Sequence, residues 1–405
     1  MGIVGAAQGG LLCPETRVTL CEVRRSLMRQ ALVLAAMTVG ASFCLGDDAL
    51  SDSQGPADAA VRLARSFERS NSQDSHAFLN PDRAVASPGR PGRMALRIQI
   101  EQGSRFLPVP NLVLHAAGSR VTALTDGSGT AFFDGCASGE SIQVQADLED
   151  DSFKIRPAIA RRLSAQGACG TETTLSFARS NPAAAALRVW RVATLAKAKL
   201  DAEVGPSAWP QGASFFVSGG AATHGIQVGV GADDTTFVVG HELGHAVSDH
   251  AGMIQQGFGD SFHQMTACIG DSGALEEGWA SFFGAWADQG LDEPDPIQEW
   301  DHHSWDKRRL PIKTVPETIE IGSMSGPQTA QVCRGTDNEM RVMSFLWNVV
   351  AADGVGVPFA TLWKALAGKN LRSVSQVALN LKSLGADEAA LRRAWDAAFK
   401  TPCPF

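Results

Sequence analysis

The spacing of apolar residues changes once along the chain, from every second residue to the period of a helix. From residue 94 onward, Leu96, Ile98 and Ile100 alternate with polar residues, which predicts a strand with one buried face. Further short apolar runs, separated by glycine-containing turns, occur at 112–115, 121–124, 131–133 and 142–146. Short strands at this spacing predict a small β-sandwich over residues 94–178.

Helical periodicity begins at residue 183 and dominates the rest of the chain. The first helix is expected over 183–203, and two strand-like runs at 214–217 and 225–230 follow it. Further helices are expected around Glu242, Trp279, Leu346, Leu362, Leu379 and Trp395. Residues 181–405 should therefore form a mainly helical domain with a short β-sheet, and the expected fold class is α+β.

Composition excludes several classes of protein. Hydrophobic residues make up 44% and charged residues 19% of the 405 residues, which excludes a wholly disordered chain and a polytopic membrane protein. Acidic residues (43) outnumber basic ones (35), and no basic stripe interrupts this balance, so nucleic acid is not an expected partner. Tyrosine is absent, which excludes any mechanism that needs a phenol.

A thirteen-residue apolar run, 31–43, lies near the N-terminus and follows Arg24, Arg25 and Arg29. The run is too short to span a bilayer but has the length of an export-signal core, and small residues follow it. We therefore expect residues 1–44 to be an export signal region.

Residues 45–93 are rich in Asp, Ser, Gly and Pro and are expected to form a disordered linker. The mature chain is expected to have no transmembrane span and to reach the periplasm, the cell surface or the medium. A lipid anchor at Cys44, directly after the apolar run, is an alternative way in which the chain would be held at the cell surface.

Cysteine spacing favours disulfides over a cysteine-based zinc site, because the chain contains no Cys-x-x-Cys pair. Cysteines of an exported protein are expected to be oxidised. We expect Cys136 to pair with Cys169 and Cys268 with Cys333, since each pair lies within one expected domain. Spacing alone leaves other pairings open.

The segment 235–247 contains His241, Glu242 and His245 in a run with helical periodicity. Residues four apart on a helix project from the same face, so both imidazoles can bind one metal ion. This His-Glu-x-x-His arrangement is typical of a zinc site in which the intervening glutamate is the general base. The alternative is a helix whose two histidines have only structural partners.

A catalytic zinc site uses three protein ligands, so a third ligand must be found. A third histidine six residues after His245 is missing, because Ala251 stands there and His250 is one residue out of register. The better option is the acidic pair Glu276 and Glu277, which lies in an apolar helical segment where a buried carboxylate needs a partner.

These residues resemble the gluzincin metallopeptidases, in which a glutamate on a second helix completes a His-Glu-x-x-His site. The run Glu277-Gly278-Trp279 is similar to the third-ligand motif of fungalysin-like and related members. The resemblance implies that Glu277 is the ligand, with Glu276 as its rival; surface positions for both are the alternative. The family usually has an aspartate four residues after the ligand glutamate, but this chain has Ser281 there.

Two further features follow from the resemblance. Glu339, before an apolar Leu-Trp pair, is expected chiefly to pack behind the site, and acceptance of a hydrogen bond there is the alternative. Related enzymes stabilise the transition state with His or Tyr, so His302 and His303 are candidates for this role, with a surface position as the alternative.

The glycine-rich strand 225–231 is expected either to bind an extended peptide at a sheet edge or to contain a bulge.

The stretch 125–133 resembles the turn and strand of carboxypeptidase-regulatory-like sandwich modules, which implies a positioning or tethering role for the sandwich.

The expected function is hydrolysis of peptide bonds in a protein or peptide substrate by an exported zinc enzyme. His241, His245 and Glu277 are the expected Zn²⁺ ligands, with Glu242 and His302 as catalytic residues. A non-peptidase zinc hydrolase and an inactive metallopeptidase-fold binding module are the alternatives.

Overall fold

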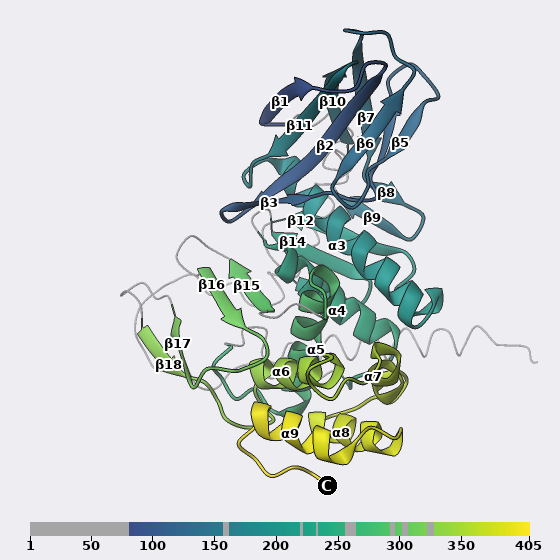
Figure 1. Cartoon of the computed structure of the whole chain (residues 1–405). Helices are drawn as coiled ribbons and strands as arrows, with labels where there is room; N and C mark the ends of the chain where they lie inside the picture. Colours follow the sequence, from purple (N-terminus) through teal and green to yellow (C-terminus); the bar gives the residue numbers. More distant parts are fainter. Residues whose placement is uncertain are drawn as a thin grey trace, which may run out of the picture. The chain divides into compact units, whose positions relative to one another are not determined.

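The computed structural model describes residues 81–156, 162–218, 222–231, 234–255, 265–291, 296–301, 307–321 and 328–405. The expected export signal at 1–44, including Cys44, lies outside the described residues, as does the linker up to residue 80. Helices and strands both contribute extensively, so the α+β fold class is confirmed (Figure 1).

Two sheets form the N-terminal part. The first has the order β1-β11-β2-β3, with β6 also paired to β2, and the second has the order β10-β7-β4-β5. Their strands are β1 (Arg83–Pro88), β2 (Arg93–Gln102), β3 (Arg105–Pro108), β4 (Val113–Ala116), β5 (Thr122–Leu124), β6 (Thr130–Asp134), β7 (Ser141–Asp147), β10 (Arg162–Ala168) and β11 (Thr171–Phe177). Apolar residues of both sheets, including Leu96, Ile98, Leu114 and Val144, are fully or almost fully buried in one core. The alternation of apolar residues therefore predicted a two-sheet arrangement correctly.

The expected linker 45–93 does not extend to residue 93. Residues 83–88 form β1, which pairs antiparallel with β11, and β2 begins at Arg93. All six side chains of β1 are exposed, so this strand is held by its backbone hydrogen bonds and lacks the alternating apolar pattern that would have identified it.

A third sheet joins the two halves of the chain. Its order is β13-β14-β12-β9-β8, formed by β8 (Glu149–Asp150), β9 (Phe153–Arg156), β12 (Ala213–Ser218), β13 (Ala222–His224) and β14 (Gln227–Gly231). Strands β8 and β9 come from within the expected sandwich 94–178, yet β9 pairs parallel with β12. Phe153 packs against Trp190, Trp209 and Phe215, and this burial explains why the hairpin joins the later sheet.

Helices make up most of the remaining chain, and all of them except the short η2 lie at positions that the sequence predicted. They are α3 (Pro182–Glu203), η2 (Pro206–Ala208), α4 (Thr236–His250), α5 (Asp271–Asp288), α6 (Glu339–Val350), α7 (Phe359–Leu366), α8 (Val374–Ser383) and α9 (Glu388–Ala398). Helix α4 packs against β13 and β14 of the third sheet and against helices α3 and α5 (Figure 1). Among the described residues, no helix has both the length and the apolarity needed to cross a bilayer.

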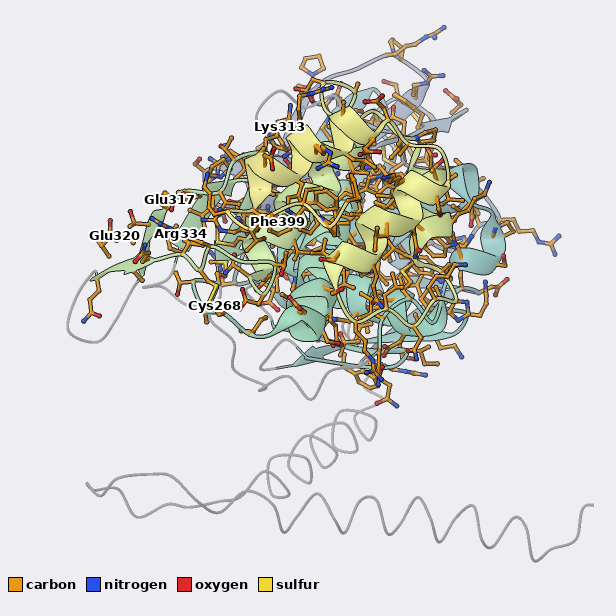
Figure 2. The ribbon with its side chains drawn as sticks, turned by 90° about the horizontal axis from the view of Figure 1, so that it is seen from below. Cys268, Lys313, Glu317, Glu320, Arg334 and Phe399 are labelled. Carbon is orange, nitrogen blue, oxygen red and sulfur yellow. A yellow bond between two sulfur atoms is a disulfide. The ribbon has the colours of Figure 1, made fainter. Side chains whose placement is uncertain are left out.

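Two antiparallel hairpins interrupt the part that was expected to be helical. They consist of β15 (Ile297–Asp301) with β16 (Lys307–Pro311), and of β17 (Thr318–Ile321) with β18 (Gln328–Gln331). In the second hairpin, Ile319 is buried in a small cluster with Val332 and Met340, separate from the main core. An exposed ion pair joins Arg334 to Glu317 at 3.1 Å beside this hairpin (Figure 2), and such a pair contributes at most about 1 kcal/mol.

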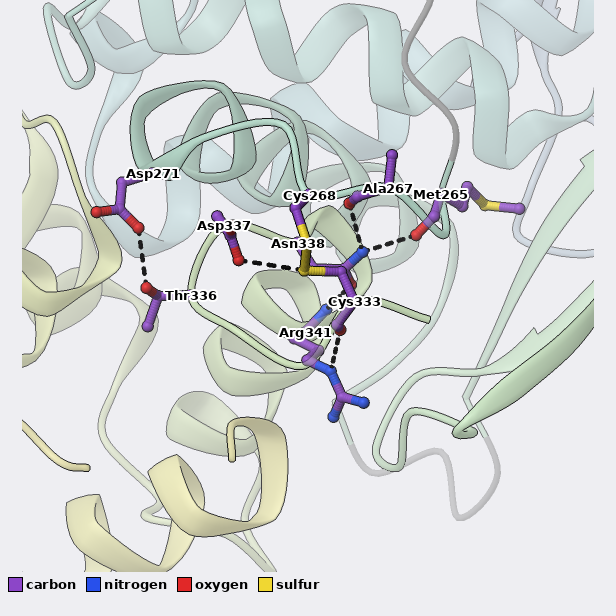
Figure 3. Close-up of a disulfide and its surroundings, with 9 residues drawn as sticks. All are labelled: Met265, Ala267, Cys268, Asp271, Cys333, Thr336, Asp337, Asn338 and Arg341. Carbon is purple, nitrogen blue, oxygen red and sulfur yellow. Dashed lines mark hydrogen bonds between the residues drawn. A yellow bond between two sulfur atoms is a disulfide. The ribbon is translucent and has the colours of Figure 1, made fainter. Parts of the chain in front are cut away.

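Both expected disulfides are present. Cys136 and Cys169 join two loops of the sandwich, and Cys268 and Cys333 join the segments that precede α5 and α6. The second disulfide lies among other links between these segments: Asn338 Nδ2 donates to the carbonyl oxygens of Met265 and Ala267 (Figure 3).

Candidate metal centre

Helix α4 is fixed at its N-terminus by residues from three parts of the chain. The hydroxyl of Thr235 caps the helix by accepting from Val238 N, and it also donates to the carbonyl of Glu299 at 2.5 Å. The side-chain oxygen of Gln102, at the end of β2, accepts the backbone N–H of Thr236 at 3.0 Å. The sandwich therefore caps the helix that carries the two histidines.

Helices α4 and α5 approach each other closely because small residues face each other. A Cβ atom added to Gly240 would lie 2.8 Å from the Cα of Gly284, a distance that real Cβ atoms essentially never show. Trp279 Nε1 donates to the carbonyl of Gly244 at 3.0 Å and fixes the relative position of the helices. This close packing brings Glu277 of α5 to the histidines of α4.

The side chains of His241, His245 and Glu277 converge on one point. The two Nε2 atoms are 3.2 Å apart, and Glu277 Oε2 lies 3.2 Å from His241 Nε2 and 3.3 Å from His245 Nε2. Ligands about 2.0–2.1 Å from a tetrahedral zinc ion are about 3.3–3.4 Å apart. The three atoms therefore have the spacing of three ligands around one metal ion, and these residues can hold one.

Glu276 is directed to a different atom of the same histidine. Its Oε1 lies 4.0 Å from His245 Nδ1, which is the nitrogen that faces away from the three converging atoms. Glu277, the glutamate that the resemblance implied as a ligand, therefore belongs to the converging group, and Glu276 lies behind His245.

The carboxylates around His245 dominate its protonation. Burial lowers the pKa of His245, but Glu277, together with Glu242 and Glu276, overrides burial and raises it to about 9. Burial raises the pKa of Glu277, but the two histidines outweigh this effect and hold the pKa well below its ordinary value. Without a metal, a proton on His245 compensates the buried carboxylate.

Ser281 lies behind the other histidine. His241 Nδ1 is 3.0 Å from Ser281 Oγ, and that hydroxyl donates to Glu339 Oε1 at 2.6 Å. Glu339 is the first residue of α6, so this contact links a third helix to the site. The sequence predicted either packing or hydrogen-bond acceptance for Glu339, and the structure shows acceptance through Ser281.

Glu242 is nearly buried, with 8% of its surface exposed, and it has a partner on the third sheet. The hydroxyl of Thr223, on β13, is 2.7 Å from Glu242 Oε2 and 2.9 Å from the carbonyl oxygen of Glu242. Thr223 has no motif around it in the sequence, and only the packing of β13 on α4 identifies it.

Several other expectations can be compared with the described residues. His302 and His303 lie outside them, so their predicted role stays a prediction. His250 is exposed and its Nε2 lies 3.1 Å from the carbonyl of Ser207, away from the converging atoms. The expectation that strand 225–231 binds a peptide at an edge is wrong, because β14 pairs with β12 on one side and β13 on the other.

A second group with metal-ligand chemistry consists of Cys268, Cys333 and Asp337 (Figure 3). The two sulfur atoms are bonded to each other, so neither is a thiolate that could bind a metal. Asp337 Oδ1 lies 3.2 Å from Cys333 Sγ and belongs to the surroundings of this disulfide.

Comparison with protein-family models and with curated proteins finds no match for this chain. Functional interpretation therefore depends on the chemistry and geometry of the residues themselves.

Proposed function

We propose that the protein is a zinc-dependent peptidase. The observation that carries this proposal is the triangle formed by His241 Nε2, His245 Nε2 and Glu277 Oε2, whose sides measure 3.2–3.3 Å. Two imidazoles and one carboxylate are a typical catalytic zinc set, and three protein ligands leave a fourth position for water or substrate.

Zinc at this position would lower the pKa of a bound water and polarise a substrate carbonyl. The residues of the chain would move the protons. Glu242 is the buried carboxylate on the turn between the two histidines, so we assign it the role of accepting the proton of the attacking water and returning it to the leaving amine nitrogen. The Thr223 hydroxyl would hold that carboxylate in one orientation.

An extended peptide is the substrate class that the third sheet favours. Within the described residues, β13 pairs only with β14 and forms the edge of the sheet. Thr223 of this strand contacts Glu242, so the edge lies beside the proposed general base. A peptide added as a further strand would present its backbone to this residue.

We further propose that the protein is exported. Two disulfides support this proposal, because disulfides persist in oxidising compartments such as the periplasm and the extracellular medium.

The decisive experiment compares the wild type with Glu242→Gln on a mixture of unstructured peptides, with zinc content measured for both. We expect the wild type to cleave peptides, and the variant to keep zinc but lose at least about 100-fold in rate. An unchanged rate in the variant would refute the role of Glu242. Turnover of esters or other amides without peptide cleavage would indicate another zinc hydrolase, and bound zinc without any turnover would indicate a binding module.

A further inference from the structure

We infer that Glu339 is a positioning residue for His241 and that it acts through Ser281. A carboxylate at position 281 would place a negative charge directly beside His241. In this protein Glu339 of α6 supplies that charge, and Ser281 of α5 connects it to His241. The inference rests on the proposed metal site but not on peptide cleavage.

The positions of the hydrogen atoms follow from the contacts. His241 Nε2 faces His245 and Glu277, so a neutral ligand imidazole carries its proton on Nδ1 and donates it to Ser281 Oγ at 3.0 Å. The serine hydroxyl has a single proton, which it donates to Glu339 Oε1 at 2.6 Å. The chain of donors thus runs in one direction, from imidazole to hydroxyl to carboxylate.

Burial makes this arrangement strong. Ser281 is 0%, Glu339 1% and His241 4% exposed, so bulk water does not compete for these hydrogen bonds. A buried carboxylate requires a compensating positive charge. A divalent cation bound at the site would compensate the charge of Glu339 in addition to those of the nearer carboxylates, so the Ser281–Glu339 pair favours the metal-bound state.

The position of Glu339 is fixed by the packing of α6 on α5. A Cβ atom added to Gly278 would lie 2.5 Å from Val342 Cβ and 3.0 Å from the carbonyl oxygen of Glu339, so only glycine permits this approach. Glu339 also stands in the first turn of α6, where Asn338 caps the helix and the helix dipole stabilises a negative charge.

The segment before α6 is anchored on both sides of this turn. Cys333 is bonded to Cys268, and Arg341 donates to the carbonyl oxygen of Cys333 (Figure 3). The buried guanidinium of Arg341 also donates to the carbonyl oxygen of Ala398. Glu339 therefore has little freedom to leave Ser281, which is what a positioning role requires.

The test measures zinc affinity by competition with a chelating dye for Ser281→Ala, Glu339→Gln and the double variant. We expect each single variant to bind zinc about 10–100-fold more weakly than the wild type. Because the two residues act in series, the double variant should be no weaker than the weaker single variant. The control is Glu388→Gln, which removes a carboxylate from the corresponding first turn of α9 and should leave zinc affinity unchanged.

A rescue variant separates positioning from packing. Ser281→Asp combined with Glu339→Gln places one carboxylate directly beside His241, and we expect it to bind zinc more tightly than Glu339→Gln alone. Circular dichroism and thermal unfolding identify variants that do not fold. If Glu339→Gln does not fold, the zinc affinity of Ser281→Ala, the smallest change, decides the test.

Zinc affinity within twofold of the wild type in folded Ser281→Ala would overturn the inference, as would additive losses in the double variant. Loss of stability at unchanged zinc affinity would also overturn it, since that outcome indicates packing alone. If the affinities change as expected but no variant, including the wild type, cleaves peptides, the positioning role holds and the proposed peptidase function fails.

Discussion

Glu276 and Glu277 are neighbours in α5, yet their carboxylates approach opposite nitrogens of His245. Glu277 Oε2 lies 3.3 Å from Nε2, and Glu276 Oε1 lies 4.0 Å from Nδ1. Of the two nitrogens of His245, Nε2 is the one that faces His241 Nε2. Only Glu277 can therefore complete a metal site with both histidines. The two residues should therefore respond differently to the same substitution.

We expect Glu277→Ala to abolish stoichiometric zinc binding and Glu276→Ala to retain it. Loss of Glu277 removes one of three ligands, whereas loss of Glu276 removes a carboxylate behind a ligand that stays in place. Metal content measured by mass spectrometry, on protein purified without chelators, checks this. Zinc lost in Glu276→Ala but kept in Glu277→Ala would reverse the assignment.

Zinc affinity should rise with pH. In the metal-free protein the pKa of His245 is raised to about 9, so below that pH a proton must leave before the nitrogen can bind zinc. Affinity should increase by about tenfold per pH unit below pH 9 from this residue alone, and then level off. Competition titrations at pH 6.5, 7.5 and 8.5 test this, and an affinity constant across the three would contradict it.

The same proton affects the stability of the metal-free protein. When folding raises the pKa of a group, the protonated group stabilises the folded protein. This stabilisation is complete below the pKa of the group in the unfolded chain, near 6.5 for histidine, and it is lost as the pH rises through the pKa in the folded protein. The free energy of unfolding of the metal-free form should therefore fall between pH 6.5 and about 9 through His245. Urea unfolding at the two ends of this range, after removal of metal, measures the change.

Thr223→Val should lower the rate of peptide cleavage without changing zinc content. The substitution removes the hydroxyl that lies 2.7 Å from Glu242 Oε2 and keeps the shape of the side chain. A hydrogen bond to a charged group contributes about 1.5–3 kcal/mol, so we expect a loss of about 10–100-fold in kcat. Thr223→Ser, which keeps the hydroxyl, is the control and should retain most of the rate; equal losses in both variants would contradict the role of the hydroxyl.

The disulfide between Cys268 and Cys333 should support the site as well as the fold. Its residues are 65 apart and those of Cys136 and Cys169 are 33 apart, so chain entropy alone assigns each disulfide about 4 kcal/mol. Only the disulfide between Cys268 and Cys333 joins the segments that precede α5 and α6, and these two helices carry Glu277 and Glu339. Paired Cys→Ser variants should thus lose similar stability, but only the 268/333 variant should also bind zinc more weakly, and equal zinc affinity in both would refute this link.

Gln102 tests whether the sandwich is an integral part of the protein. Its side chain accepts from Thr236 N and donates to Glu299 Oε2 at 3.0 Å. Glu299 Oε2 also accepts from Arg105, so Gln102→Leu leaves mainly the buried N–H of Thr236 without its partner. We expect a loss of about 1–3 kcal/mol in the free energy of unfolding. Gln143→Leu, which removes a hydrogen bond to Ser164 within the sandwich, is the control and should cost less, since Gln143 is exposed.

Short-range patterns predicted the α-helices of the described residues and the strands β2, β4, β5, β6, β7, β12 and β14, but not the other strands. The four-residue spacing of His241 and His245 places both imidazoles on one face of any helix, whatever surrounds it. Alternation over residues 96–100 identified β2 for the same local reason. The strands β1, β3, β8–β11, β13 and β15–β18 were missed. Strand β1 illustrates the reason, because all six of its side chains are exposed and it has no buried apolar face.

The sequence by itself determined the residue types of the site and the helices that carry them, since both depend on contacts within one or two turns. Tertiary structure alone decided which glutamate faces Nε2 of His245, which strand forms the sheet edge, and how the outer nitrogen of His241 is supported. The Ser281–Glu339 contact joins residues 58 apart, and the Thr223–Glu242 contact residues 19 apart. Such contacts depend on how closely helices and sheets pack, through residues such as Gly240, Gly278 and Gly284, and no local period encodes them.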